Sequence, residues 1–147
     1  MKVFVGTDHN GYNLKSKLVN FLRKQGYEVV DDSIGPLNPD DDYPVFAKKV
    51  VMDMQAAGDP DARGILICGS GQGMCMAANR FKGIRACLGY DRESVRAARN
   101  DDDANVLCVA TRTLEADTSY SLVETMLLTP FAAAQRFSRR IQEMDQV

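Results

Sequence analysis

Short apolar runs alternate with amphipathic stretches along the whole chain. The runs have the length and the β-branched or aromatic content of buried strands, and they cover Lys2–Asp8, Tyr27–Asp31, Ile65–Cys68, Ile84–Leu88 and Val106–Val109. Between them, apolar residues recur at helical spacing, which predicts helices over Leu14–Leu22, Pro44–Ala56, Met74–Phe81, Arg92–Arg99, Leu114–Leu128 and Phe131–Met144. This alternation predicts an α/β fold: a three-layer, Rossmann-like sandwich with a five-stranded parallel sheet and an extended C-terminal helix.

Two polar stretches interrupt the alternation and are expected to be loops. The longer one, Ser33–Tyr43, contains two prolines and three consecutive aspartates, Asp40 to Asp42. We interpret the aspartates as a solvated acidic surface. The second polar stretch, Asn100–Asn105, separates the fourth predicted helix from the last predicted strand.

Composition adds limits on size and partners. The 147 residues are 45% hydrophobic and 26% charged, which predicts one globular domain spanning residues 1–147. A net charge of −2 gives no overall attraction to nucleic acid or to an anionic membrane. No apolar run approaches the roughly 20 residues that cross a bilayer, and the N-terminus opens directly on a predicted strand, so we expect a cytoplasmic protein.

Cysteine and histidine usage argues against a metal centre. The four cysteines form no CxxC pair, which excludes the common zinc-site and disulfide-framework patterns. His9 is the only histidine, so a site with several histidine ligands is excluded. We therefore expect no metal site, and any catalysis that needs a histidine must use His9.

The best candidate for chemistry is the segment that follows the third predicted strand. That strand ends at Cys68, and Gly69, Gly71 and Gly73 follow, with Ser70 among them, before the next predicted helix. A glycine turn between a strand and a helix offers unobstructed backbone N–H groups to an anion, and a thiol near a helix start has a favoured thiolate form. The spacing matches neither the P-loop nor the dinucleotide fingerprint. A tight chain reversal beside an inert buried cysteine remains the alternative.

Ligands of parallel sheets bind beyond the carboxyl ends of the strands. That edge should gather the residues that follow the predicted strands, namely Asp8, His9, Cys68 to Gly73, Tyr90, Thr111 and Arg112. In the last predicted helix, Arg136 and Arg140 share a face at i and i+4 spacing. An anion such as phosphate would relieve their repulsion, although the charge pattern alone favours a solvated basic helix.

These motifs resemble one enzyme family along essentially the whole chain. The matching segments are GTDHNGYNLK near the start, DYP at residues 42–44, ICGSGQGM and AAN within residues 67–79, and DANVL at residues 103–107. They are similar to those of the ribose-5-phosphate isomerase B and galactose-6-phosphate isomerase family. The resemblance implies aldose–ketose isomerisation of a sugar phosphate through a cis-enediolate, without a metal or an organic cofactor.

The resemblance also implies a role for each matching residue. Cys68 matches the base that takes the proton from carbon 2, and Ser70 matches a hydroxyl near the reacting carbons. The amides of Gly69 to Gly73 match the hole for the enediolate oxygen. The implied sugar ligands are Asp8 and Tyr43, and the implied phosphate ligands are His9, Arg112, Arg136 and Arg140. The family forms dimers, often paired into tetramers, with the site shared between subunits.

The sequence departs from the family pattern at two places. Many members carry histidine and then asparagine where Asp101 and Asp102 stand here. That histidine assists ring opening, so Asp101 becomes the candidate for this step, with Asp102 or Asp8 as substitutes. Ala133–Gln135 and Phe137 also replace common family residues near the phosphate end.

The sequence therefore supports several functions. The first is interconversion of ribose 5-phosphate and ribulose 5-phosphate. The second is isomerisation of a phosphorylated hexose such as allose or galactose 6-phosphate. The third is a non-catalytic sugar-phosphate-binding subunit. A phospho-acceptor switch, suggested by Asp31 and Asp32, explains none of the motifs quoted above.

Overall fold

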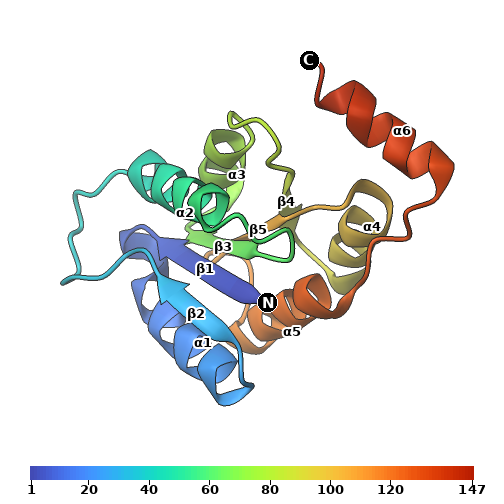
Figure 1. The fold of residues 1–147 in the computed structure, drawn as a ribbon. Helices are drawn as coiled ribbons and strands as arrows, with labels where there is room; N and C mark the ends of the chain where they lie inside the picture. The colour runs from blue at the N-terminus through green and yellow to red at the C-terminus, as the bar shows by residue number, and fades with distance from the viewer.

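A computed structural model describes all 147 residues and contains one five-stranded sheet in which every pairing is parallel (Figure 1). The strands are β1 (Lys2–Thr7), β2 (Glu28–Asp31), β3 (Arg63–Cys68), β4 (Ala86–Gly89) and β5 (Val106–Ala110). The helices are α1 (Tyr12–Lys24), α2 (Tyr43–Ala57), α3 (Gln72–Ala78), α4 (Arg92–Asp102), α5 (Ala116–Leu128) and α6 (Gln135–Met144). The predicted α/β class and parallel sheet are confirmed.

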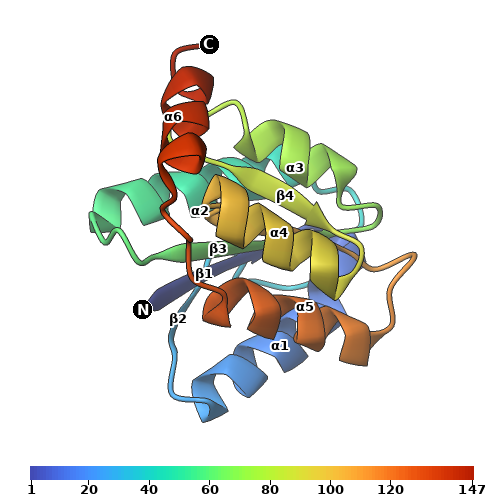
Figure 2. The same cartoon turned by 90° about the vertical axis from the view of Figure 1, so that its right-hand side faces the viewer.

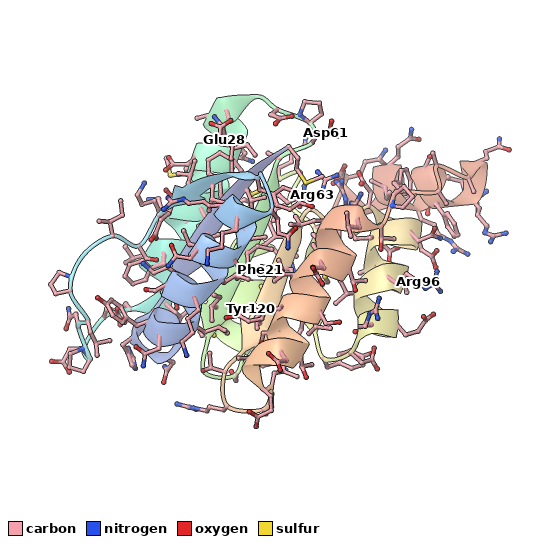
Figure 3. All side chains as sticks on the ribbon, turned by 90° about the horizontal axis from the view of Figure 1, so that it is seen from below. Phe21, Glu28, Asp61, Arg63, Arg96 and Tyr120 are labelled. Atoms are coloured by element: carbon pink, nitrogen blue, oxygen red, sulfur yellow. The ribbon has the colours of Figure 1, made fainter.

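Helices cover both faces of the sheet and create two apolar layers. One layer packs α1, α4 and α5 against the sheet through Leu18, Leu122 and their neighbours. The other layer packs α2 and α3 against the opposite face through Val50, Met74 and their neighbours (Figure 1). Figure 3 shows the rings of Phe21 and Tyr120 between α1 and α5, where they stack with centroids 5.1 Å apart. No helix is long and apolar enough to cross a membrane.

The sheet order, β2-β1-β3-β5-β4, places β3 at the centre. Its neighbours are β1, where Thr7 pairs with Ile67, and β5, where Ala110 pairs with Cys68. All six residues of β3 are buried. Because the strands are parallel and in this register, the residues that follow β1, β3 and β5 emerge side by side at one edge.

The fourth helix is longer than the sequence pattern predicted. The loop expected over Asn100–Asn105 is wrong at its start, because α4 continues to Asp102. Asp103 ends the helix in a left-handed conformation (φ +48°). Its carboxylate accepts from Arg99 Nη1 at 2.7 Å and from Arg85 Nη2 at 2.8 Å, and these ion pairs offset the strain of that backbone.

The last helix is shorter than predicted and stands apart from the sheet. It begins at Gln135 rather than at Phe131, because residues 129–134 run over the end of α4, where Ala132 N donates to Asn100 O at 3.0 Å. Phe137 is the only buried residue of α6. Figure 2 shows α6 extending away from the layered body, on the same side as the N-terminus.

Candidate active site

The carboxyl edge brings together residues that the sequence predicted there. Asp8 follows β1 and donates its backbone N–H to Ile67 O at 3.4 Å, next to Cys68. The backbone N–H of Thr111 donates to Cys68 O, and that of Arg112 donates to Gly69 O, each at 3.0 Å. Three chain segments that are far apart in sequence therefore meet around Cys68.

The glycines after β3 allow other side chains to approach this turn closely. A Cβ on Gly69 would lie 2.9 Å from Arg112 Nε, and a Cβ on Gly73 would lie 2.6 Å from Tyr43 Cζ. Gly71 has a left-handed backbone (φ +74°). Glycine at these positions places the Arg112 guanidinium and the Tyr43 ring directly against the turn.

Cys68 lies at the base of the turn, with 5% of its surface exposed. Its Sγ accepts a hydrogen bond from Gly71 N at 3.1 Å. Burial raises the pKa of the Cys68 thiol, and backbone N–H groups of Met74, Gly71 and Ser70 oppose that rise. The sequence predicted a favoured thiolate. The amides do act in that direction, but desolvation outweighs them, so that prediction is wrong for the free protein. Ser70 itself is exposed on the turn.

Directly after β1, Asp8 caps a short 3₁₀ turn, η1 (His9–Gly11), which contains His9. The Asp8 carboxylate accepts from Asn10 N at 3.0 Å and from Asn10 Nδ2 at 3.3 Å. His9 Nδ1 lies 2.7 Å from Asp41 Oδ1, and the same oxygen accepts from His9 N at 3.0 Å. The hydrogen bond to Asp41 is the largest influence on His9, and it raises the pKa of the imidazole.

Asp41 is therefore a residue that the sequence interpretation missed. It was assigned to a solvated acidic loop, yet only 15% of its side chain is exposed and it binds His9. The only sequence signal was its position two residues before Tyr43, immediately before the DYP motif. Asn10, which contacts Asp8 and His9, was also missed.

A buried ion pair ties the loop after β2 to this edge. Lys15 Nζ donates to Asp31 Oδ2 at 2.7 Å and to Ser33 O at 3.2 Å. Ser33 Oγ in turn accepts from Thr7 N at 3.2 Å and donates to Asp31 Oδ1 at 3.3 Å. The loop that carries Asp41 is thus fixed at its start to the strand that carries Asp8.

A cavity of about 100 Å³ lies between that loop and the strand end. Its lining includes Thr7, Asp8, Tyr12, Ser33 and Asp41. A larger groove of about 930 Å³ lies elsewhere, between the segment from Asn79 to Cys87, the last turn of α4 and the C-terminal residues. The carboxyl edge is the candidate site, because the thiol, the imidazole and the guanidinium of Arg112 meet there.

Four other predicted site residues lie away from that edge. Because α4 starts after the carboxyl end of β4, its last turn, with Asp101 and Asp102, returns to the amino edge. Asp101 Oδ1 accepts from Asn100 Nδ2 at 2.7 Å, and Asp102 lines the larger groove. Arg136 and Arg140 belong to α6, which packs against α4 (Figure 2). One chain therefore does not bring them to Cys68.

Tyr90 is not brought to the thiol either. It follows β4, which β5 separates from β3 in the sheet, and most of its surface is exposed. No group of three or more His, Cys, Asp or Glu side chains is arranged to hold a metal ion. The side chains at the carboxyl edge are instead a thiol, carboxylates, an imidazole, a phenol and a guanidinium. This set suits acid–base chemistry on a small anion.

Known proteins match this chain over nearly its full length. A family model described as "Ribose/Galactose Isomerase" matches residues 3–144. A probable ribose-5-phosphate isomerase B of Mycoplasma pneumoniae is 40% identical over 139 residues, which are 95% of this chain and 90% of that protein. The ribose-5-phosphate isomerase B of Mycobacterium tuberculosis is 33% identical over 141 residues, covering 96% of this chain and 86% of that protein.

Solved structures agree over almost the full length. The ribose-5-phosphate isomerase B of Mycoplasma genitalium with bound ribulose 5-phosphate has a TM-score of 0.93 at 35% identity, covering 99% of this chain and 94% of that one. The enzyme of Thermotoga maritima has a TM-score of 0.91 at 38% identity, covering 99% and 98% of the two chains.

Proposed function

Because this chain belongs to the ribose/galactose isomerase family, we propose that it interconverts ribose 5-phosphate and ribulose 5-phosphate. The observation that carries the proposal is the meeting of Cys68, the glycine turn, His9 and Arg112 at one edge. A relative of the same fold holds ribulose 5-phosphate, which supports this choice of substrate.

The reaction assigned to the edge starts at carbon 2 of the open-chain aldose. The thiolate of Cys68 takes the proton from carbon 2, the C–H electron pair forms the C1–C2 double bond, and the carbonyl pair moves onto the carbon 1 oxygen. The proton then returns to carbon 1, and the proton of the carbon 2 hydroxyl passes to the carbon 1 oxygen, which gives the ketose. The proton and electron movements of these steps balance without a cofactor.

The surrounding groups have distinct roles in this proposal. Backbone N–H groups of residues 69–73 stabilise the negative oxygen of the enediolate, which is the largest expected aid to such a reaction. Ser70 donates near the reacting carbons, while Asp8 and Tyr43 bind sugar hydroxyls. His9 and Arg112 bind the phosphate, which supplies binding energy that positions carbon 2.

We propose that a second copy of the chain completes the site. Asp101 and Asp102 on α4, and Arg136 and Arg140 on α6, lie away from Cys68 in one chain. A homodimer, alone or paired into a tetramer, would bring these groups over the carboxyl edge of the partner. Asp101 would then assist ring opening, and the two arginines would bind phosphate through their guanidinium forks.

A phosphorylated hexose is the second candidate substrate, because the matching family includes galactose isomerases by its description. The sequence departs from the family pattern at Asp101 and at Ala133–Gln135, and these altered segments would provide the room that a longer sugar needs. Rates on ribose, allose and galactose phosphates separate the two candidates. A chain that binds all three without turnover would instead be a non-catalytic subunit.

The direct test measures ribulose 5-phosphate formation by purified wild-type protein, Cys68→Ala and Cys87→Ala. Loss of a general base costs about 10²–10⁴-fold in rate, so Cys68→Ala should lose activity by that factor. Cys87, on β4, is the matched control because it is a partly buried thiol outside the edge. Equal rates for all three proteins would remove Cys68 from the mechanism.

A further inference from the structure

The only histidine of the chain is held by a single carboxylate through two bonds. Asp41 Oδ1 lies 2.7 Å from His9 Nδ1 and 3.0 Å from the backbone nitrogen of His9. The Asp41 side chain is 15% exposed and that of His9 is 33% exposed. One oxygen therefore fixes both the start of η1 and the orientation of the ring.

This contact determines which ring nitrogen changes its protonation state. An ionised carboxylate only accepts hydrogen bonds, so Nδ1 carries a hydrogen whenever Asp41 is charged. Nε2 is then the atom that gains or loses the second proton. It lies 3.1 Å from Asn10 Nδ2, which also lies 3.3 Å from Asp8 Oδ2. Without its proton Nε2 accepts from Asn10, and with its proton it becomes a donor for an anion.

On balance, the charged groups that face His9 favour the doubly protonated, cationic form of its imidazole. Asp41 and Asp8 raise the pKa of His9, whereas Arg112 and partial desolvation lower it. The direct hydrogen bond to Asp41 is the largest of these influences. Replacing this carboxylate with a neutral group should therefore weaken the cationic form of the ring.

We propose that Asp41 is a positioning residue that keeps the proton of His9 on Nδ1, so that the ring takes up its second proton on Nε2 when it binds the phosphate of the substrate. This inference rests on the proposed function for the identity of the anion, but the contact itself does not depend on turnover. The loop after β2 then has a defined role, because it supplies the counter-charge for the imidazolium.

The first test is an NMR titration of the imidazole, which gives a single set of signals because the chain has one histidine. We expect the wild-type pKa to lie above the ordinary value and to fall in Asp41→Asn. The matched control is Asp40→Asn, an exposed neighbour of the same charge, which should leave the pKa in place. Asp41→Glu should restore part of the rise. A His9 pKa that is the same in the wild type and in Asp41→Asn overturns the proposal.

The second test measures anion binding with sulfate, which stays dianionic across the range from pH 5.5 to 8 and so contributes no titration of its own. Calorimetry in two buffers of different ionisation enthalpy counts the protons taken up. We expect uptake by the wild type at pH 7.5, and a loss of affinity on the order of tenfold in Asp41→Asn, because a charge-assisted bond is lost. At pH 5.5 the two proteins should bind sulfate nearly equally. Identical affinity and proton uptake at pH 7.5 overturn the proposal.

Neither measurement requires isomerase activity. A protein that fails to convert ribose 5-phosphate but shows Asp41-dependent titration and sulfate binding refutes the proposed function and supports the inference. An active enzyme whose His9 titrates identically in the wild type and Asp41→Asn refutes the inference alone.

Discussion

Replacing Lys15 with methionine should destabilise the fold through the carboxylate that it leaves behind. The Lys15 side chain is 6% exposed and that of Asp31 is 17% exposed, with Nζ 2.7 Å from Oδ2. Removing one partner of a buried ion pair costs about 3–5 kcal/mol, because the other charge stays buried without compensation. Asp31 retains bonds from Ser33 N at 3.1 Å and Ser33 Oγ at 3.3 Å. Those bonds and its partial exposure favour the lower end, about 3 kcal/mol.

The assay is urea unfolding at one fixed protein concentration, since association would otherwise alter the apparent stability. Lys17→Met, an exposed lysine on the same helix, is the matched control and should change the free energy of unfolding by less than about 0.5 kcal/mol. Adding Asp31→Asn to Lys15→Met removes both charges, so the double variant should lose less than the sum of the single losses. A loss below about 1 kcal/mol for Lys15→Met would refute the reasoning from buried charge.

Three further predictions concern the turn, the thiol and a second buried carboxylate. Because burial raises the pKa of Cys68 and the proposed base is the thiolate, kcat measured at saturating substrate should rise about tenfold per pH unit from pH 6 to 8, and a flat profile contradicts this. Gly71→Ala should cost about 1–3 kcal/mol in urea unfolding, since its φ is +74° and the added Cβ would collide with Leu88. Burial raises the pKa of Asp32 from 3.8 to about 6 even though Lys49 lies 3.1 Å away. The folded state therefore holds a proton there between these values, so wild-type stability should fall relative to Asp32→Asn as the pH rises from about 4 to 6. An unchanged difference in unfolding free energy across that interval contradicts this assignment.

The fold class could be predicted because the apolar pattern and the buried environment agree along most of the chain. Ile65 to Cys68 reads as a fully buried strand, and the structure places it at the centre of the sheet. The shared carboxyl edge followed from parallel pairing alone. Strand order did not follow, because nothing in the local sequence of Val106–Val109 indicates that it inserts between the third and fourth strands.

Site details depended on contacts that periodicity does not encode. Asp41 belongs to an acidic run typical of a surface loop, and only the folded chain shows its bond to His9. The helix α4 continues to Asp102, three residues beyond the end that its apolar pattern predicts, because Arg99 and Arg85 stabilise the left-handed conformation of Asp103. The pKa of Cys68 is set by a balance between desolvation and amide contacts, and sequence indicates only the amides.

The pairing of β3 with β5 joins two strands that are synthesised at different times. On the ribosome, the strand that ends in Cys68 emerges about 40 residues before its partner at residues 106–110. Until that partner arrives, an apolar strand presents unpaired backbone groups along one side, which is a template for intermolecular pairing. We therefore expect released chains truncated near residue 100 to aggregate, and chains that extend past residue 110 to lack this hazard.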